Sequence, residues 1–224
     1  MLNSLWSRAA LCASLLLVAR AAFPAPAAAQ DAAHTRLLES AAAGRTKGAE
    51  SATVLIYEIA DFQCPYCAQF ANDVFPQIDS AYVATGRVQW VFVNLPMPSH
   101  TNAWLAAEAA LCAGAVSGRF WAMHDRLFAA GIEWSAAANP GPSFTLYAQQ
   151  AGVAMEAYQT CVAQDRMAPL ILQDVIFGSR VTGTPTFLVN NAKTIVGVKS
   201  FEEWREILDA ELKKEPPRRD QPSR

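Results

Sequence analysis

Two cysteines three residues apart, Cys64 and Cys67, constrain this chain more than any other feature of its sequence. The apolar run at residues 53–60 precedes them and is rich in β-branched and aromatic residues, a composition that predicts a strand. Beyond Cys67, apolar residues recur at helical spacing. We therefore expect the pair at a strand-to-helix junction. Cys64 then begins the helix, and Pro65 takes the first helical position, where a missing N–H costs nothing.

This position predicts a reactive thiol at Cys64. The unpaired backbone N–H groups and the positive end of the helix dipole face its sulfur and favour the thiolate. In such a setting the pKa of the nucleophilic thiol of a C-x-x-C pair falls from about 8.5 to roughly 3.5–7.5. Tyr66 lies between the two cysteines in the sequence. We expect its side chain to be exposed at the site, where it can contact a substrate and tune the pKa of Cys64.

The first 29 residues have the pattern of an export signal. Arg8 follows the start, residues 9–19 are apolar, and the alanines at 27–29 offer a small-residue cleavage site. The apolar stretch is too short to span a bilayer, and Arg20 interrupts it. The sequence therefore predicts a cleaved signal peptide at residues 1–29 and a periplasmic protein.

Charge and hydropathy argue against several classes of partner. The chain has 20 acidic and 18 basic residues, a balance that does not point to nucleic acid or to an anionic membrane surface. No second apolar segment approaches the length of a membrane span. No Cys/His spacing matches a zinc site, and Cys67 lacks the following histidine of a c-type haem motif. We expect no metal and no cofactor, and structural hydrogen bonds from His100 and His124.

Four cysteines lie outside the predicted leader: Cys64, Cys67, Cys112 and Cys161. An even number in an exported protein favours disulfides, and four cysteines allow three pairings. The count alone does not choose among them. Cys64 and Cys67 can close their own ring at the helix start, which leaves Cys112 with Cys161 by elimination. That candidate structural disulfide would close a loop of about 50 residues, worth roughly 4 kcal/mol in the chain-entropy model.

The remaining periodicities predict an α/β order of strand, helix, strand, helical segment, hairpin and helix. Asn190 and Asn191 suit the turn of the hairpin, and Pro76 is expected to kink the first long helix. The expected segments are a short helix and loop in an N-terminal extension at 30–50, a helix at 64–85, a strand at 87–93, a mostly helical stretch broken near Pro169, strands at 186–189 and 194–196, a helix at 201–213, and a disordered tail at 214–224.

Four motifs follow one another along the chain: D-F-Q-C-P-Y-C at 61–67, L-P at 95–96 with His100, G-R-F-W-A-M-H-D at 118–125, and G-T-P-T at 183–186. Together they resemble the thioredoxin-fold family and, more narrowly, the exported DsbA-like thiol:disulfide oxidoreductases. The resemblance covers residues 51–212. It implies an α/β thioredoxin-like fold with an inserted α-helical subdomain, the domain at 51–213 and the insert at about 99–178.

The resemblance also implies roles for further residues. It places a cis peptide bond before Pro185, in a loop that faces the cysteine pair, and it pairs the backbone of Thr184 with an extended substrate. Pro65, Tyr66, Thr184 and Pro185 are then substrate-binding residues. Related proteins carry a buried carboxylate six positions before the first cysteine. At Glu58, burial would raise the pKa and suit the group to proton exchange with Cys67. The alternative is that Glu58 faces solvent from an edge strand.

The predicted function is that of an exported thiol:disulfide oxidoreductase, an enzyme that introduces disulfides into reduced, folding exported proteins through Cys64 and Cys67. By resemblance, reoxidation needs a DsbB-like quinone-linked membrane protein. Two alternatives stay open. One is a disulfide reductase or isomerase that works from the dithiol form, because Pro-Tyr between the cysteines also occurs in glutaredoxins. The other is a non-catalytic thioredoxin-like binding module in which the cysteine pair is a structural cross-link.

Overall fold

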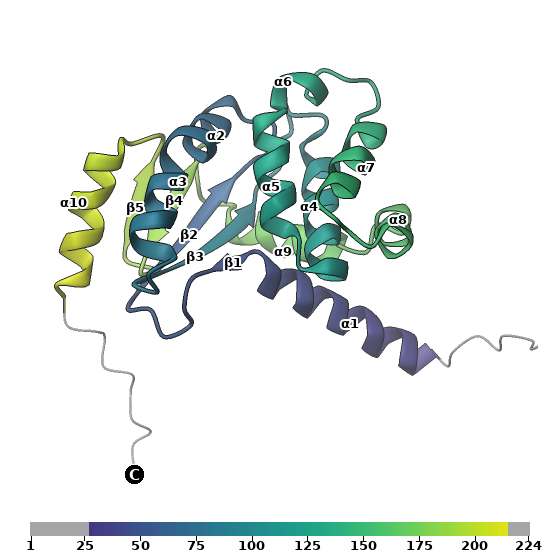
Figure 1. Ribbon diagram of the computed structural model, residues 1–224, viewed down its shortest axis with the longest axis horizontal. Coiled ribbons are helices and arrows are strands. Elements are labelled where there is room, and N and C mark those ends of the chain that lie inside the picture. The colour runs from purple at the N-terminus through teal and green to yellow at the C-terminus, as the bar shows by residue number, and fades with distance from the viewer. Residues whose placement is uncertain (1–26, 215–224) are drawn as a thin grey trace, which may run out of the picture.

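A mixed five-stranded sheet forms the centre of the molecule, with the strand order β1-β3-β2-β4-β5 (Figure 1). The computed structural model describes residues 27–214. Most of the predicted leader and all but the first residue of the predicted tail lie outside the described residues. β2 and β3 run parallel, and β4 pairs antiparallel with both β2 and β5. The strands are β1 (Thr46–Lys47), β2 (Val54–Ala60), β3 (Val88–Asn94), β4 (Thr186–Val189) and β5 (Lys193–Val196).

This sheet confirms the predicted order of elements. The β4–β5 hairpin turns at Asn190 and Asn191, whose φ angles of 51° and 55° are the left-handed values that a tight hairpin turn requires. β1, which pairs with Trp90 and Val91 of β3, was not expected. A two-residue strand has no periodicity of its own, and its pairing depends on a partner far along the chain.

The helix that begins after Cys64 continues to residue 83, with two wide π-helical turns. Pro76 lies in the first turn of its third segment. Proline cannot donate the i→i−4 hydrogen bond, and the π-helical turn before it absorbs the irregularity that the sequence predicted as a kink. The segments are α2 (Pro65–Gln69), η1 (Phe70–Val74), α3 (Phe75–Ile78) and η2 (Asp79–Val83).

Six helices lie between β3 and β4 and confirm the predicted helical insertion. The break expected near Pro169 is found at residues 164–167, and Pro169 itself occupies the first turn of α9, where proline is tolerated. The short helix α6 was not expected. The helices are α4 (Ala103–Ser117), α5 (Phe120–Ala129), α6 (Gly131–Trp134), α7 (Gly141–Gln150), α8 (Met155–Ala163) and α9 (Ala168–Phe177).

An 18-residue helix, α1 (Ala27–Gly44), lies along α4. The helix predicted here is present, but it is longer than expected and begins inside the predicted leader. The two helices approach closely at a pair of glycines, since a Cβ added at Gly44 would lie 3.5 Å from the Cα of Gly114. Next in the chain, Arg45 forms a buried ion pair with Asp174 of α9, so the N-terminal segment is tied to the helical insert.

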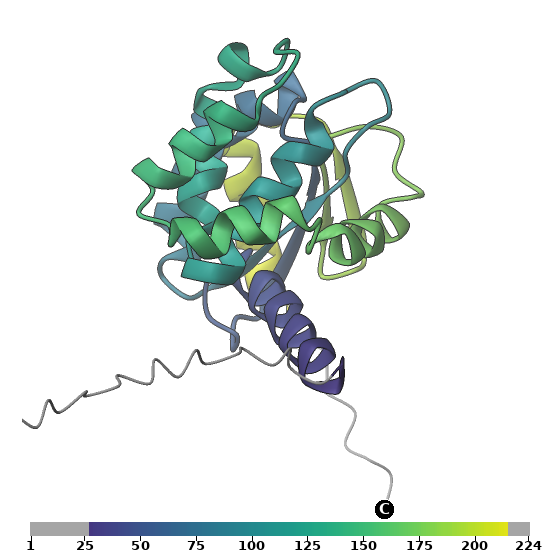
Figure 2. The ribbon, with the colours of Figure 1, turned by 90° about the vertical axis from the view of Figure 1, so that its right-hand side faces the viewer.

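Helices cover both faces of the sheet (Figures 1 and 2). α3 and α10 (Phe201–Leu212) pack on one face, over an aromatic core in which the rings of Phe187 and Trp204 lie 4.8 Å apart. α9 packs on the other face, against Ile59 and Val93. None of the helices within residues 27–214 is long and apolar enough to cross a membrane.

A disulfide joins Cys112 of α4 to Cys161 of α8, 49 residues apart in the sequence. This is the pairing expected by elimination. We predict that the double substitution Cys112→Ala, Cys161→Ala lowers the free energy of unfolding by about 2–5 kcal/mol. Urea unfolding of the variant and the parent, both with Cys64 and Cys67 reduced, measures the difference. A loss below about 1 kcal/mol would show that the cross-link does little to stabilise the insert.

Candidate active site

Cys64 occupies the residue before the first helical position, as the sequence predicted, with Pro65 beginning α2. Its backbone is extended, with φ −74° and ψ 123°. Its N–H donates to the carbonyl of Asp61 at 3.1 Å, and its own carbonyl accepts from Ala68 at 3.0 Å, so the local chain holds it firmly at the helix start. Both cysteines are free thiols. The structure therefore describes the reduced form of the pair.

The two thiols differ strongly in acidity. A hydrogen bond from the Cys67 thiol, opposed by partial burial and aided by Thr184 and by the N–H groups of Tyr66 and Cys67, lowers the pKa of Cys64 to about 5. Burial, followed by the hydrogen bond to Cys64, raises the pKa of Cys67 well above its usual range. At neutral pH the arrangement therefore holds one thiolate at Cys64 and one protonated thiol at Cys67.

The loop before β4 faces this pair. The Thr184–Pro185 peptide bond is cis, and the carbonyl oxygen of Thr184 lies 3.4 Å from the Cys64 sulfur. Tyr66 is 64% exposed beside the two sulfurs. The structure thus brings Cys64, Cys67, Tyr66 and the Thr184–Pro185 loop into one site, although they come from segments about 120 residues apart.

Glu58 is buried in the central strand β2, where only 1% of its surface is exposed. The alternative hypothesis, that Glu58 faces solvent from an edge strand, is wrong because β3 and β4 flank β2 on either side. The indole N–H of Trp90 donates to Oε2 at 2.8 Å, whereas Oε1 has no partner. Desolvation, only partly opposed by this hydrogen bond, raises the pKa of Glu58 to about 8.

Asp61 was not singled out by the sequence analysis, yet its buried carboxylate organises the loop that carries Cys64. Oδ1 accepts from the N–H of Gln63 at 2.7 Å. Oδ2 accepts from the N–H of Met97 at 2.7 Å and lies 2.8 Å from Nδ1 of His100. An aspartate that ends a strand before a turn is a local signal for the first contact. The contacts to the loop after β3 had no local signal.

Gln63 extends the same network into the helical insert. Its Oε1 accepts from the N–H of Asn102 at 2.8 Å, and its Nε2 donates to the carbonyl of Ser135 at 2.9 Å. The loop that presents Cys64 is therefore held from both sides, by the loop after β3 and by the segment after α6. This residue, too, was missed because its partners are distant in the sequence.

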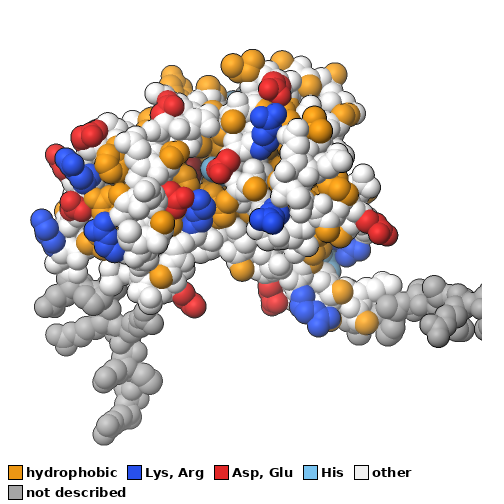
Figure 3. Space-filling view, viewed as in Figure 1, with side chains coloured by type: hydrophobic (Ala, Val, Ile, Leu, Met, Phe, Trp, Pro, Cys, Tyr) orange, Lys and Arg blue, Asp and Glu red, His pale blue; other side chains and the backbone are white. Residues whose placement is uncertain are grey.

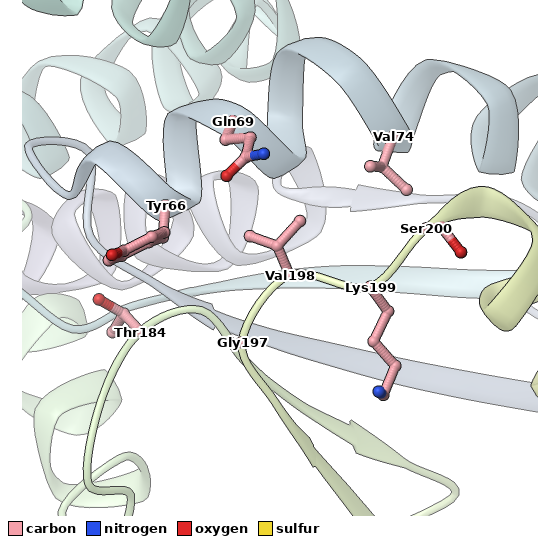
Figure 4. Close-up of a pocket in the computed structure, with 8 residues that line it drawn as sticks. All are labelled: Tyr66, Gln69, Val74, Thr184, Gly197, Val198, Lys199 and Ser200. Atoms are coloured by element: carbon pink, nitrogen blue, oxygen red, sulfur yellow. The ribbon is translucent and has the colours of Figure 1, made fainter.

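A groove of about 580 Å³ lies beside the site, between the helix that starts at Pro65 and the loop that joins β5 to α10 (Figure 4). Tyr66 on α2 lies close to Thr184, and the side chain of Val198 points from the β5–α10 loop toward the helix. The lining residues are Tyr66, Gln69, Val74, Thr184, Gly197, Val198, Lys199 and Ser200.

One cluster within the described residues has the residue types of a metal site. Ligand atoms of Glu108, Cys112 and Cys161 lie within 4.8 Å of one another. The two cysteines form the disulfide, so their sulfurs are not thiolate ligands here. His124 lies buried among aromatic rings with Nδ1 2.8 Å from Asp125, and burial lowers its pKa. These contacts agree with a structural role for His124.

A five-stranded sheet with a helical insertion, and a C-x-x-C pair facing a cis-proline loop, define a thioredoxin-like protein of the DsbA type. The chain belongs to the thioredoxin family, whose family model matches residues 40–210. The resemblance stated from the motifs and the predicted fold class are therefore confirmed.

Several known proteins share this architecture. Disulfide bond formation protein D of Bacillus subtilis is 26% identical over 172 residues, which cover 74% of this chain and 76% of that protein. The crystal structure of oxidised BdbD from Bacillus subtilis superposes with a TM-score of 0.69 at 26% identity, covering 77% of this chain and 95% of that one. Wolbachia pipientis α-DsbA1 shares the fold. Its crystal structure superposes with a TM-score of 0.67 at 19% identity, covering 75% of this chain and 90% of that one.

Two further relatives are sodium/proton antiporters named NhaA. The one from Salinispora tropica is 37% identical over 150 residues, which cover 66% of this chain but 22% of the antiporter. This chain therefore spans about a fifth of those proteins. The matching region is a minor part of each antiporter, and the antiporter's name describes the whole protein.

The difference in acidity between the two thiols is directly testable. Only the thiolate reacts with iodoacetamide, so the alkylation rate of Cys64 in the reduced protein should rise with pH through a midpoint near 5. Cys67 should react slowly across the same range. Mass spectrometry after timed quenching locates the label. A Cys64→Ala variant is the control and should show no fast labelling below pH 7, whereas a Cys64 midpoint near 8.5 would contradict the site as described.

Proposed function

We propose that this protein is a thiol:disulfide oxidoreductase that donates the Cys64–Cys67 disulfide to reduced polypeptides. The observation that carries the proposal is the position of Cys64 at the start of α2, with its sulfur 3.4 Å from the carbonyl oxygen of Thr184, in surroundings that lower its pKa. A thiolate that is stabilised in the reduced protein makes the corresponding disulfide more oxidising. Relatives named for disulfide bond formation and protein-disulfide oxidoreduction support the same class of reaction.

The reaction is a pair of thiol–disulfide exchanges. A substrate thiolate attacks the Cys64 sulfur of the disulfide form, a mixed disulfide forms, and Cys67 leaves as a thiolate that takes up a proton. A second thiolate of the substrate then attacks the substrate sulfur of the mixed disulfide. This step forms the substrate disulfide and releases Cys64 as a thiolate. The substrate loses two electrons and the Cys64–Cys67 pair gains them. The depressed pKa of Cys64 makes it the better leaving group in the second step.

Glu58 is proposed to exchange the proton with Cys67. The support is its burial, its unpartnered Oε1 and its raised pKa, which keep a large share of the carboxyl groups protonated at neutral pH. Glu58 and Trp90 point to the face of the sheet that the helix from Cys64 covers. Below pH 8 the protonated carboxyl can deliver a proton to the leaving Cys67 thiolate, which would otherwise carry a charge in a buried place.

The substrates are proposed to be reduced, folding proteins outside the cytoplasm. The leader pattern at residues 1–29 and the Cys112–Cys161 disulfide both suit an oxidising compartment. Pro65, Tyr66, Thr184 and Pro185 would contact the substrate, with the backbone of Thr184 pairing with its extended chain. Because each turnover leaves Cys64 and Cys67 reduced, the cycle needs an electron acceptor, for which a DsbB-like membrane quinone reductase is proposed.

The direction of transfer is tested by equilibrating the protein with mixtures of reduced and oxidised glutathione. We expect the Cys64–Cys67 disulfide to be reduced at a lower ratio of reduced to oxidised glutathione than an ordinary protein disulfide. We also expect the oxidised protein to form disulfides in a reduced, unfolded substrate. Cys64→Ser should abolish this activity, and Cys112→Ala with Cys161→Ala serves as the control that keeps the active pair.

Each alternative has its own outcome in this experiment. A pair that stays oxidised in excess reduced glutathione, in a protein that reduces disulfides, would indicate a reductase or isomerase. An ordinary thiol pKa at Cys64 with no exchange at all would indicate a binding module with a structural cross-link.

The proton-exchange role of Glu58 predicts a specific pH effect. For the oxidised protein, the rate of reduction by a thiolate of fixed concentration should fall as pH rises through about 8, because Glu58 loses its proton there. Glu58→Gln should slow the reaction at pH 7 by about tenfold or more and remove this inflection. Glu108→Gln alters another buried carboxyl, one that lies in the helical insert, and should change neither rate nor profile. An unchanged profile in Glu58→Gln would remove Glu58 from the mechanism.

A further inference from the structure

A second groove, of about 530 Å³, lies on the other side of the reactive sulfur. It runs between the helix that starts at Pro65 and the α5–α6 segment. Cys64 itself lines it, so whatever is joined to the Cys64 sulfur lies at its edge. The lining residues are Phe62, Gln63, Cys64, Pro65, Ala68, Asn72, Phe128, Ala129, Gly131, Ile132 and Ser135. Apart from Cys64, whose thiol ionises, none of these side chains is titratable, and most of them are apolar.

Ile132 stands at the rim of this groove with 99% of its surface exposed. Its neighbour Trp134 in the same short helix is fully buried, so α6 is anchored at one residue and presents the other to solvent. In the space-filling view, hydrophobic side chains gather at the upper edge of the molecule, where α6 lies (Figure 3). When a partner covers a fully exposed isoleucine, apolar surface is removed from water, which is favourable.

The two grooves use two faces of one helix. Tyr66 and Gln69 face the groove that Thr184 closes, and Pro65 and Ala68 face the groove that Ile132 borders. A polypeptide bonded to the Cys64 sulfur and paired with the backbone of Thr184 fills the first groove with one flank of its chain. Its other flank must leave across the second groove, because the Cys64 sulfur lies between the two.

We propose that the groove bordered by Ile132 binds an apolar side chain of the substrate, next to the reacting cysteine on the flank that points away from Thr184. This inference rests on the proposed function and adds a specificity site to it. The occupant is fixed by the covalent chemistry, since only a chain attached to Cys64 is held over this groove during exchange. Ile132 would then be a specificity-determining residue.

The chemistry of the lining selects against negative charge. An acidic side chain placed in this groove loses hydration and finds no cationic partner among the lining residues. An acidic residue is also repelled by the Cys64 thiolate that leaves in the second exchange. A leucine, isoleucine or phenylalanine instead covers Ile132 and Phe128 and removes apolar surface from water.

The test uses dithiol peptides that carry Leu, Ser or Asp next to the attacking cysteine, either before or after it, and measures kcat/KM for their oxidation. For one of the two placements we expect Leu to exceed Asp by about tenfold or more. Ile132→Ser should reduce this ratio to below about threefold. Leu146→Ser, at a half-exposed apolar residue of α7 that lines neither groove, should leave the ratio unchanged.

Dithiothreitol has no flanking side chains, so its oxidation tests the proposed function separately from this inference. The wild-type protein and both variants should oxidise dithiothreitol at the same rate. If they do and Ile132→Ser keeps the full preference for Leu, or if neither placement shows a preference, the groove is not a specificity site. If the wild-type protein does not oxidise dithiothreitol, the proposed function fails, and the inference fails with it.

Discussion

The interaction on which the site depends is the set of hydrogen bonds that the Cys64 sulfur receives at the start of α2. The Cys67 thiol and the N–H groups of Tyr66 and Cys67 stabilise its thiolate. These donors converge only because Cys64 keeps an extended backbone while Pro65 begins the helix. The buried carboxylate of Asp61 fixes the preceding turn through the N–H of Gln63. A single helix start thereby creates the reactive group and its geometry.

Burial opposes the acidity that hydrogen bonds give to Cys64, and it is the dominant effect at two other groups of the site. Cys67 and Glu58 both lie out of contact with water, and desolvation raises the pKa of each. The outcome at neutral pH is a thiolate at Cys64 and protonated groups at Cys67 and Glu58. In the proposed mechanism, the substrate thiolate attacks Cys64 and Glu58 supplies the proton to Cys67. The difference follows from hydrogen bonding at Cys64 and from desolvation at Cys67 and Glu58 rather than from unusual residue types.

The helical insert and the sheet contribute different parts of the site. The sheet supplies the strand before Cys64 and the Thr184–Pro185 loop that faces it, whereas the insert supplies Phe128 and Ile132 on the other side of the sulfur. The Cys112–Cys161 disulfide, and the buried ion pair of Arg45 with Asp174, hold the insert in place. The site thus lies at the interface between the sheet and the helical insert, with a groove on each side of the reactive sulfur.

The sequence by itself determined the strand before Cys64, the helix after it, the hairpin at Asn190 and the order of the main elements, because these depend on local periodicity and turn chemistry. The motifs added the Thr184–Pro185 loop by resemblance. Only the tertiary structure decided that β2 is central and Glu58 buried, that Asp61 contacts Met97 and His100, and that β1 and α6 form. Each of these depends on partners that only folding brings together. Burial and long-range hydrogen bonds leave no periodic trace in the chain, and so they cannot be read from it.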